Sequence, residues 1–591
     1  MTAISDATID STEFNLLIEP WIKVLRDDGS TDELSLLEVF READKLISLA
    51  GEMKAQDMAV LRLLLAILHA VFGKQEDGMY VSLTGGAAVR LRLNTVSDML
   101  NRWEELWLMK KFPFEIISEY LEKYRDRFWL FHPTHPFYQV ANLKEMLNVE
   151  QVSDKKPPRG YFNAGKLNGE LAESDNKPSL FANRSDEYKY QLNYSEAARW
   201  LIYLNAYDDT SGKPTDQYSK FYKKLPKAEQ NRRILGVGWL GKLGILSARG
   251  VNLFETLMLN FVLVTDFGDR LWGIENPVWE REPKSEERTP INVPDNASEL
   301  LTIQSRRLLL HRDGKESLVR GYFLLGGDFF YKDQECFAEQ MTIWQATKTQ
   351  SLDRAVFEPK EYDPSRQMWR DLLSLLPIVK DYTSEKTNGR PNRNPGIVNW
   401  LAILQNKGIL GDRLISYEVA GILYGDKKSK ANNNFFDEIT MSALLLGDEY
   451  EEYRERILAV LPWTEKIVEC LSSLAWNLAI AGGSIGENGK KRRIDAAEIA
   501  RQEGYFQLDI PFRNWLESLN PKSELSVEAS IASWAKQARS IIRSIGRDLV
   551  RIEGMNAFTG REYEEQKKKK LMTSPKAYNI FISSIRKQSN P

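Results

Sequence analysis

The chain has 591 residues, of which 42% are hydrophobic, 28% charged and 11% aromatic, and this composition is typical of a globular protein of two to four domains. Its 80 basic and 83 acidic residues give a net charge of −3, which excludes a generally basic protein and leaves only local basic patches for phosphate contacts. The two cysteines, Cys336 and Cys470, exclude a disulfide framework, argue against a cysteine-based zinc site and favour a reduced, cytoplasmic location.

The first part of the chain mixes strand and helix patterns. Its opening residues are polar and acidic, unlike a signal peptide. Residues 14–24 and 34–40 flank an Asp-Gly turn, which predicts a strand, a turn and then a second strand or a helix start. Residues 53–124 are predicted to be helical. Within them the apolar run 60–73 is shorter than a membrane span and carries an arginine and a histidine, so we expect a buried helix and no membrane contact.

The middle of the chain is less regular. Residues 144–193 are polar and rich in proline and glycine, which predicts a long, exposed excursion. A helix is predicted over 194–207 with Ser195 as its N-cap, and a loop over 208–224 follows it. Residues 251–264 predict another helix. Residues 300–328 predict a β-hairpin or meander that turns near Asp313 and Gly314.

The character of the chain changes after about residue 438. Four amphipathic helical stretches are predicted, over residues 449–482, 493–519, 526–554 and 574–588. Pro462 and Pro511 are placed to interrupt the first two. We therefore predict an α+β fold, with a large mixed α/β N-terminal domain over 1–440 and a C-terminal four-helix bundle over 441–591.

One stretch has the spacing of a dinucleotide-binding fingerprint, with Gly236, Gly238 and Gly241 in GVGWLG. Such a loop needs an apolar strand before it and a helix opening inside it. The preceding residues, KAEQNRRIL, are too polar for a buried strand, and Gly244 and Gly250 interrupt the expected helix. We therefore favour a structural glycine-rich loop, with a nucleotide-binding enzyme as the alternative.

Two further patterns are weak signs of chemistry. The sequence GGSIG around Ser484 has the spacing of a nucleophile elbow, but a helix precedes it where a strand is required, so we favour a glycine cluster at a helix C-terminus. His132 and His135 have a spacing found in metal sites, but Pro133 and Pro136 break any helix there, which favours a packed turn. We expect no catalytic residues, no metal and no cofactor, and hence a protein that is not an enzyme.

Basic clusters make nucleic-acid binding a serious hypothesis. They occupy residues 220–233, 312–315, 425–430, 489–493 and 567–570, and several of them are predicted to lie in loops beside glycine, serine or asparagine. Any one charge run is usually a solvated face, whereas several in loops suit phosphate and groove contacts.

The order of several stretches is specific. FNLLIEPWIKV, FHPTHPFYQV, GWLGKLGILSARGVNLFETLMLN, LLTIQSRRLLLHRDG, EYDPSRQMWRDLLSLLP and DIPFRNWLESL follow one another in this chain. Together they resemble the CasA family, the large subunit of the type I-E CRISPR Cascade complex, over nearly the whole chain.

This resemblance implies a function. A member of the family sits with other Cascade subunits at the 5′ end of the guide RNA and reads a short protospacer-adjacent motif in double-stranded DNA. It helps to open the duplex for R-loop formation and recruits a helicase-nuclease, without catalysis of its own. The division of labour is physically sensible, because guide pairing carries sequence specificity while the protein reads a short duplex element.

The resemblance also implies site residues. The motif-reading loop maps to Ser211, Gly212 and Lys213, although only one glycine is present where the family has more. A hairpin lysine maps to Lys315, whose ammonium could donate to minor-groove acceptors; without the resemblance, a solvated turn lysine would be favoured.

A third reading element is a wedge hairpin. It maps to Lys427, Lys428 and Ser429, where the family tends to carry a glutamine, so that the wedge here would depend on phosphate attraction; alternatively the wedge lies at 432–434.

A guide-contacting loop maps to Phe181, Ala182 and Asn183. A scaffold that binds only protein stays open as a further alternative. The sequence does not define which motif is read.

Overall fold

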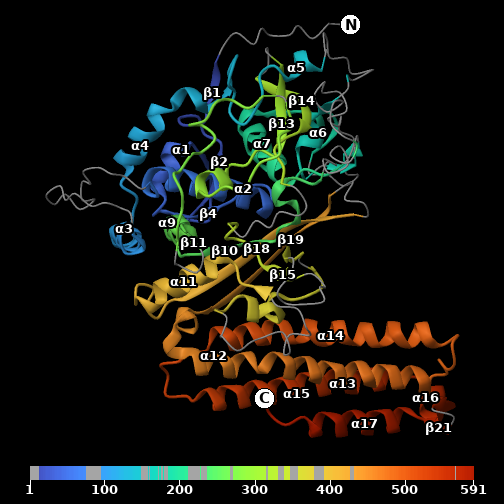
Figure 1. Cartoon of the computed structure of the whole chain (residues 1–591). Coiled ribbons are helices and arrows are strands. Elements are labelled where there is room, and N and C mark those ends of the chain that lie inside the picture. Colours follow the sequence, from blue (N-terminus) through green and yellow to red (C-terminus); the bar gives the residue numbers. More distant parts are fainter. Residues whose placement is uncertain are drawn as a thin grey trace. The chain divides into compact units, whose positions relative to one another are not determined.

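The fold is that of a computed structural model (Figure 1). The structure describes residues 12–74, 95–147, 158, 160–170, 172–174, 177–178, 184–210, 227, 236–265, 270–285, 287–313, 317–330, 338–346, 357–361, 363–377, 392–425, 431–565 and 568–591.

The chain divides into two compact units. The first unit comprises Met1–Tyr362, Ser384–Leu401 and Tyr417–Asp437. The second unit comprises Asp363–Thr383, Ala402–Ser416 and Glu438–Pro591. The last and longest segment of the second unit begins close to residue 440, where the sequence predicts the domain boundary. The second unit also contains two earlier segments, which a single boundary at that residue does not include.

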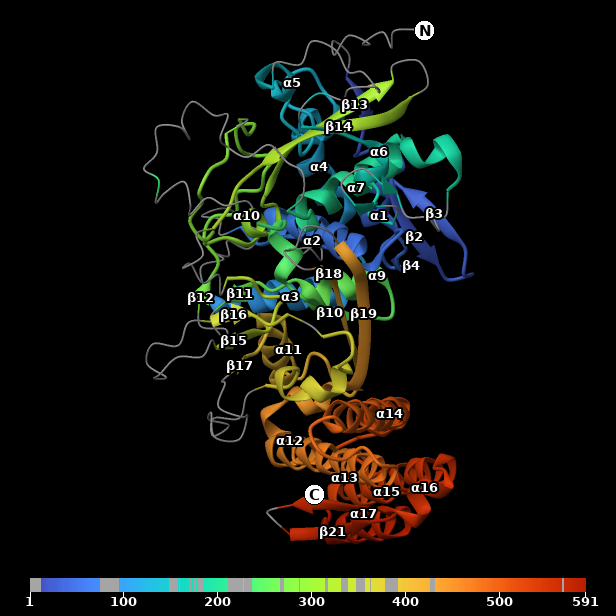
Figure 2. The ribbon, with the colours of Figure 1, turned by 90° about the vertical axis from the view of Figure 1, so that its right-hand side faces the viewer.

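The core of the first unit is built around helix α2 (Lys54–Phe72). Helices α7 (Tyr194–Tyr207), α9 (Leu253–Asn260) and α10 (Ala297–Leu301) pack against it, and Figure 2 shows α2 between α7 and α9. By length and composition α2 is apolar enough to cross a membrane, but 89% of its apolar window is buried inside the protein. Its hydrophobic side chains therefore form the core, as the sequence predicted for residues 60–73.

A small antiparallel sheet precedes α2. Strand β2 (Ile22–Arg26) lies between β3 (Thr31–Leu34) and β4 (Leu46–Leu49), and Gly29 takes a φ of +83° at the Asp-Gly turn between β2 and β3. Helix α1 (Leu36–Glu42) begins directly after β3, with Ser35 as N-cap in a capping box with Glu38. The predicted turn and helix start are confirmed. The strand predicted over 14–24 is wrong in part, because a turn at 16–19 divides it into β1 (Glu13–Asn15) and β2.

The predicted β-hairpin is also confirmed. Strands β13 (Arg306–Asp313) and β14 (Leu318–Gly326) pair in antiparallel fashion, and β14 pairs further with β6 (Tyr161–Asn163) and β9 (Leu192–Asn193). Within residues 144–193, Tyr188 and Tyr190 are exposed, but residues 160–168 are mostly buried, so the expectation of an exposed excursion is wrong for this second part. Its short helix α6 (Ala164–Leu167) is buried, because Ala164 and Leu167 fill the space against α7 and β14.

Four long helices make up most of the second unit: α13 (Val460–Ala481), α14 (Lys490–Glu517), α15 (Val527–Ile552) and α17 (Ser574–Lys587). Helix α13 packs against the other three, and all four lie side by side in Figures 1 and 2. They coincide with the four predicted stretches and confirm the α+β fold with a C-terminal helical bundle. Pro462 lies in the first turn of α13, where a proline is tolerated, and α14 continues through Pro511.

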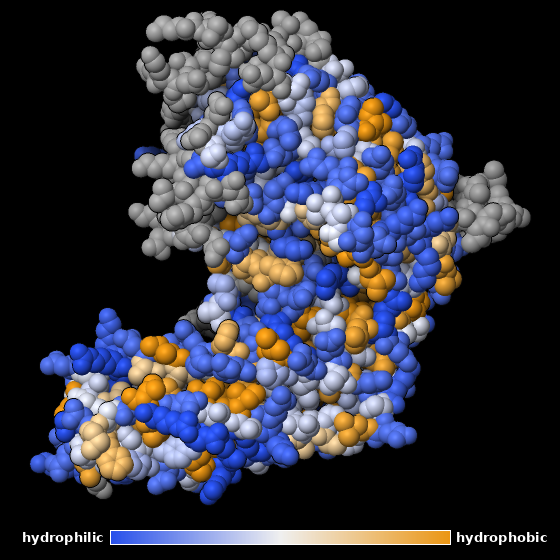
Figure 3. Space-filling model, turned by 180° about the vertical axis from the view of Figure 1, so that it is seen from behind, coloured by the Kyte–Doolittle hydropathy of each residue, from blue (hydrophilic) through white to orange (hydrophobic). Residues whose placement is uncertain are grey.

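The surface of the helical unit is not uniformly polar. Hydrophobic side chains gather among hydrophilic ones on the face shown in Figure 3, on the part of the molecule that holds α13 to α17. Three large apolar side chains of α14, Ile499, Phe506 and Ile510, are exposed at helical spacing.

Candidate nucleic-acid interface

The alternative wedge position, residues 432–434, lies in strand β19 (Ala431–Ser442). All the other site residues suggested by the sequence lie outside the described residues. This holds for the reading loop Ser211–Lys213, for Lys315, for Lys427–Ser429 and for the guide-contact residues Phe181–Asn183. The residues that flank them are described, and these show from which elements each segment leaves and returns.

The flanks of the reading loop meet at the C-terminal end of α7. This helix spans Tyr194–Tyr207, and its N-cap is Asn193, whose side chain forms a capping box with Glu196. The prediction of Ser195 as N-cap is wrong, because Ser195 lies inside the first turn and its hydroxyl donates to Glu33 at 2.7 Å. Asp208 follows the helix, and the chain returns at Gly236. The Gly238 amide donates to the Asp208 carbonyl oxygen at 2.7 Å, so the two flanks are joined by a backbone hydrogen bond. The predicted loop after 207 therefore has a fixed base.

The guanidinium of Arg306 binds both flanks of the loop at this hydrogen bond. Arg306 is 3% exposed and forms a buried ion pair with the Asp208 carboxylate. Its Nη2 donates to the carbonyl oxygens of Asp208, Asp209 and Gly236, at 3.3, 3.2 and 2.8 Å. One buried charge thus satisfies carbonyl groups on both flanks, which would otherwise be costly to bury.

The flank of the wedge hairpin reaches the same place. Tyr424 is the last residue of strand β18 (Leu414–Tyr424), and its hydroxyl donates to the carbonyl oxygen of Tyr207. Burial raises the pKa of Tyr424 well above its usual value, so the hydroxyl keeps its proton for this bond. The described flanks of Ser211–Lys213 and of Lys427–Ser429 therefore share the C-terminal end of α7.

The glycine fingerprint belongs to this junction. A Cβ on Gly238 would lie 2.6 Å from the Ala206 carbonyl carbon and 2.8 Å from the Tyr207 nitrogen, so glycine allows two backbones to touch. The Gly241 amide donates to the Gly238 carbonyl oxygen at 2.9 Å. A four-residue 3-10 helix (Trp239–Lys242) and then strand β10 (Ile245–Arg249) follow, where a dinucleotide loop would open an α-helix. These amides are occupied by protein acceptors.

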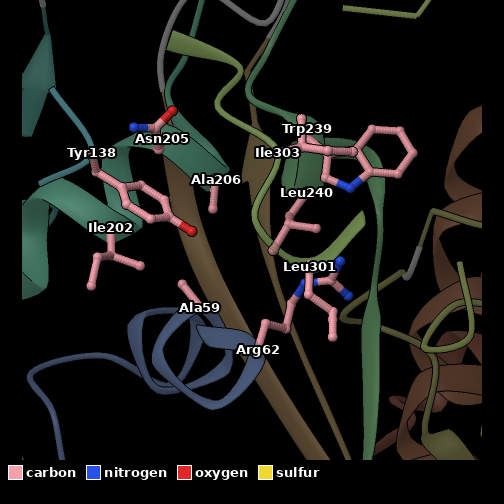
Figure 4. Close-up of a pocket in the computed structure, with 10 residues that line it drawn as sticks. All are labelled: Ala59, Arg62, Tyr138, Ile202, Asn205, Ala206, Trp239, Leu240, Leu301 and Ile303. Carbon is pink, nitrogen blue, oxygen red and sulfur yellow. The ribbon is translucent and has the colours of Figure 1, made fainter. Parts of the chain in front are cut away.

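A small pocket lies behind the junction. Its volume is about 30 Å³, and Figure 4 shows Tyr138 and Asn205 on one side of it and Trp239 and Leu240 on the other. Asn205 Nδ2 and Trp239 Nε1 are buried without a protein partner, which suits one or two bound water molecules. Ligand pockets measure roughly 300 Å³ or more, so this space does not accept a nucleotide.

The flanks of Lys315 lie elsewhere. Arg306 and Asp313 occupy opposite ends of β13, roughly 23 Å apart at the usual rise per residue of a strand. At the Asp313 end, Leu318 pairs with Asn193, and Arg320 donates to the Gln191 side chain.

Arg184, the described residue that follows the guide-contact residues, contacts the same segment around Gln191. The Arg184 guanidinium forms an ion pair with Glu196 and also donates to the Gln191 carbonyl oxygen at 3.4 Å. The flanks of Lys315 and of Phe181–Asn183 therefore share the segment around β9. They do not join the C-terminal end of α7.

The histidine pair forms a packed turn. Asp126 lies 2.6 Å from His135 Nε2 and 3.6 Å from His132 Nε2, so three potential ligands face one another. However, His132 Nδ1 accepts the amides of Thr134 and His135, at 3.2 and 3.1 Å. Its proton is therefore on Nε2 and points toward Asp126, which leaves no lone pair there for a metal ion.

The sequence GGSIG ends a helix. Gly483 has a φ of +106°, its amide donates to the Ile480 carbonyl oxygen, and the Ser484 amide donates to that of Ala479. This is a Schellman motif at the end of α13, and it explains Gly483, which takes the left-handed position, and the place of Ser484. The interpretation as a helix C-terminus is confirmed.

Sequence reasoning missed the two residues that hold the α7 junction, Arg306 and Tyr424. The SRR sequence before the hairpin carried no signal of burial, because the acid that neutralises Arg306 is 98 residues away. Tyr424 likewise gave no signal in the sequence, because its acceptor, the Tyr207 carbonyl oxygen, is 217 residues away. The fold and the junction define a two-unit α+β protein whose candidate segments leave from backbone junctions.

Comparisons with known proteins agree with this description. The sequence model of CRISPR-associated protein Cse1 matches residues 15–545, and the chain belongs to this CasA/Cse1 family. A relative from Thermus thermophilus, named CRISPR-associated protein CasA/Cse1, is 30% identical over 272 residues, which span 46% of this chain and 43% of that relative.

Solved structures share the fold over nearly the whole chain. The crystal structure of Thermobifida fusca Cse1 is 30% identical, with a TM-score of 0.72 and coverage of 98% of this chain and 99% of that one. A chain of a CRISPR RNA-guided surveillance complex is 15% identical, with a TM-score of 0.63 and coverage of 98% and 99%.

Proposed function

We propose that this protein is the large, non-catalytic subunit of a cytoplasmic CRISPR RNA-guided surveillance complex of the Cascade type. In this role it recognises a protospacer-adjacent motif in double-stranded DNA, helps to unwind the target for R-loop formation and recruits a helicase-nuclease. It works with other Cascade subunits and a guide RNA in antiviral defence, and it needs no cofactor and no membrane.

Family membership and the shared fold support this proposal. The observation that supports it most directly within the protein is the junction at the end of α7. There, one buried arginine and one tyrosine hydroxyl fix the flanks of Ser211–Lys213 and of Lys427–Ser429. Motif reading requires short loops held in register on a rigid support, because a minor-groove contact is lost when its donor is displaced.

The proposal gives the segments different tasks. Ser211, Gly212 and Lys213 read the motif, with Lys427, Lys428 and Ser429 as the wedge that separates the strands. Phe181, Ala182 and Asn183 contact the guide RNA. Lys315 reads the motif from its own hairpin, whose described flank lies at β9 beside that of the guide-contact segment.

A binding experiment with the assembled complex tests the assignment of Lys315. Affinity for target duplexes with a cognate or a scrambled flanking motif is measured for the wild type, for Lys315→Ala and for the exposed control Lys407→Ala. If Lys315 reads the motif, its loss should reduce discrimination by roughly 1–3 kcal/mol, or about 5- to 150-fold, and the control should behave as wild type. Unchanged affinity together with unchanged motif dependence contradicts the assignment.

The nucleotide-binding alternative has a separate test. The amides of Gly238 and Gly241 already donate to protein carbonyl groups, so we expect no heat of nucleotide binding in a calorimetric titration of the isolated chain. Tight binding that Gly238→Trp abolishes without unfolding the chain would favour the alternative.

A further inference from the structure

A row of basic side chains runs along the outer face of α15 in the second unit. Lys536, Arg543 and Arg547 are spaced seven and four residues apart, which places them on one side of an α-helix. Lys536 and Arg547 are exposed, and Arg543 is half-buried. The opposite side of α15 is buried, including Ile531 and Trp534 at 2% and 0% exposure, so the row faces away from the bundle core.

No acidic residue neutralises this row. Helix α15 has two carboxylates, Glu528 and Asp548, which pair with Arg456 at 3.3 Å and with Arg551 at 3.4 Å. The sequence from 529 to 547 contains no acid. Among the residues that the structure describes, no carboxylate lies within 4.0 Å of the side-chain nitrogens of Lys536, Arg543 or Arg547.

Helix α17 extends the positive surface. Its sequence contains Lys576, Arg586 and Lys587 and no acid. It packs against α15, and its C-terminal end lies beside Arg539, whose guanidinium donates to the Gln588 carbonyl oxygen at 2.7 Å. The exposed Arg586 and Lys587 therefore continue the charge of α15 around this end of the bundle.

The electrostatics of Arg539 agree with an unneutralised surface. Burial and the like charge of Arg543 lower the pKa of Arg539, and no carboxylate contributes to the shift. Arg543 Nε is also buried without a hydrogen-bond acceptor. The row Lys536, Arg543 and Arg547 therefore lacks carboxylate partners, and Arg543 also repels the neighbouring Arg539. Both features favour the binding of an external polyanion.

We propose that Lys536, Arg543 and Arg547 of α15, with Arg586 and Lys587 of α17, form a basic face that binds the phosphate backbone of double-stranded DNA without reading its sequence. The row from Lys536 to Arg547 spans ~16 Å along a straight helix. A duplex is stiff and carries one phosphate charge per ~1.7 Å of its axis, so it offers several phosphates to a straight row at once. A single strand would have to be ordered first, and the only aromatic residue of α15, Trp534, is buried and unavailable for base stacking.

This inference rests on the proposed function, which brings a DNA duplex to the protein. The test compares the wild-type full chain with three variants in binding to a 40-base-pair duplex that lacks any cognate motif, and to single-stranded DNA and RNA of the same sequence. The first variant is Lys536→Gln/Arg543→Gln/Arg547→Gln. The matched control, Arg456→Gln/Arg501→Gln/Lys522→Gln, removes the same charge from side chains of the same unit that are 43%, 32% and 51% exposed and already have carboxylate partners.

The first variant should bind the duplex at least about 10-fold more weakly at 0.1 M salt, and its plot of log affinity against log salt should be shallower by about 2–3. The control should stay within about 2-fold of wild type. The rescue variant Arg543→Lys/Arg547→Lys should keep duplex binding, because it keeps the charge. Melting curves of each variant verify the fold, which matters most for the replacement of the half-buried Arg543.

Three results would overturn the inference. Unchanged duplex affinity in the first variant would show that the basic face does not bind DNA, and an acidic protein surface would then be its ligand. An equal loss in the control would reduce the effect to net charge, and a larger loss for single strands than for the duplex would exclude duplex DNA as the ligand. The proposed function can fail independently of this inference. In the assembled complex, the first variant should lower the affinity for all motifs by the same factor and keep their ranking. If the wild-type complex shows no ranking of motifs, motif reading is refuted, but the basic face is not.

Discussion

Replacing Gly238 by alanine tests the α7 junction directly. The added Cβ would lie 2.6 Å from the Ala206 carbonyl carbon and 2.8 Å from the Tyr207 nitrogen, and backbone atoms cannot turn aside as a side chain can. Overpacking of this kind costs about 1–3 kcal/mol. The shift would also strain the 2.7 Å hydrogen bond from the Gly238 amide to Asp208, which adds about 1 kcal/mol. We therefore expect the free energy of unfolding to fall by about 2–4 kcal/mol.

The same fingerprint supplies a matched control. A Cβ on Gly236 would meet no atom within 4 Å, and Gly236 is not among the glycines with positive φ. Gly236→Ala should therefore be neutral or raise the free energy of unfolding by about 0.4–1 kcal/mol. Denaturant titration followed by circular dichroism measures both variants. Equal stability of the two variants would refute the account of the junction, since only a Cβ on Gly238 meets backbone atoms. A phosphate-binding loop predicts a loss of nucleotide binding instead.

Three further substitutions have defined outcomes in denaturation experiments. Glu339→Ala should cost about 3–5 kcal/mol, because it strands the charge of Arg62, its buried partner at 2.8 Å; a loss below 1 kcal/mol would mean that water reaches the pair. Burial raises the pKa of Asp57 to about 6, above its unfolded value of 3.8. The stability of the wild type relative to Asp57→Asn should therefore fall by up to about 3 kcal/mol as the pH rises from 4 to 7. A difference that stays constant over this range would contradict the prediction. Tyr424→Phe should cost about 1–2 kcal/mol by leaving the Tyr207 carbonyl unsatisfied, and a neutral result would argue against that bond.

Much of the fold was predictable because its signals are local. The helical bundle follows from apolar residues at three- and four-residue steps, as in Trp534, Ala538 and Ile542 of α15. The hairpin of β13 and β14 follows from apolar runs on either side of an Asp-Gly pair. Each pattern is contained within about thirty residues of sequence.

The rest depends on partners that are distant in sequence. The described part of 144–193 is polar in composition, yet α6 is buried, since α7 and β14 supply the surface that covers it. Arg306 resembles a surface arginine until Asp208 is placed beside it by the fold. The candidate site residues came from resemblance to a family, and the residues alone favoured a solvated turn at Lys315. Periodicity predicts which face of an element is buried, but it does not predict which far residue completes it.

The most direct test of the proposed function is a motif-library binding measurement with the whole complex. Duplexes with a fixed guide-matched target and a randomised flanking motif are sorted by affinity for the complex assembled with and without this chain. The proposal predicts that the complete complex selects a restricted set of motifs and that the complex lacking the chain binds with no motif preference. The same ranking in both complexes would contradict it, because the motif would then be read by another subunit.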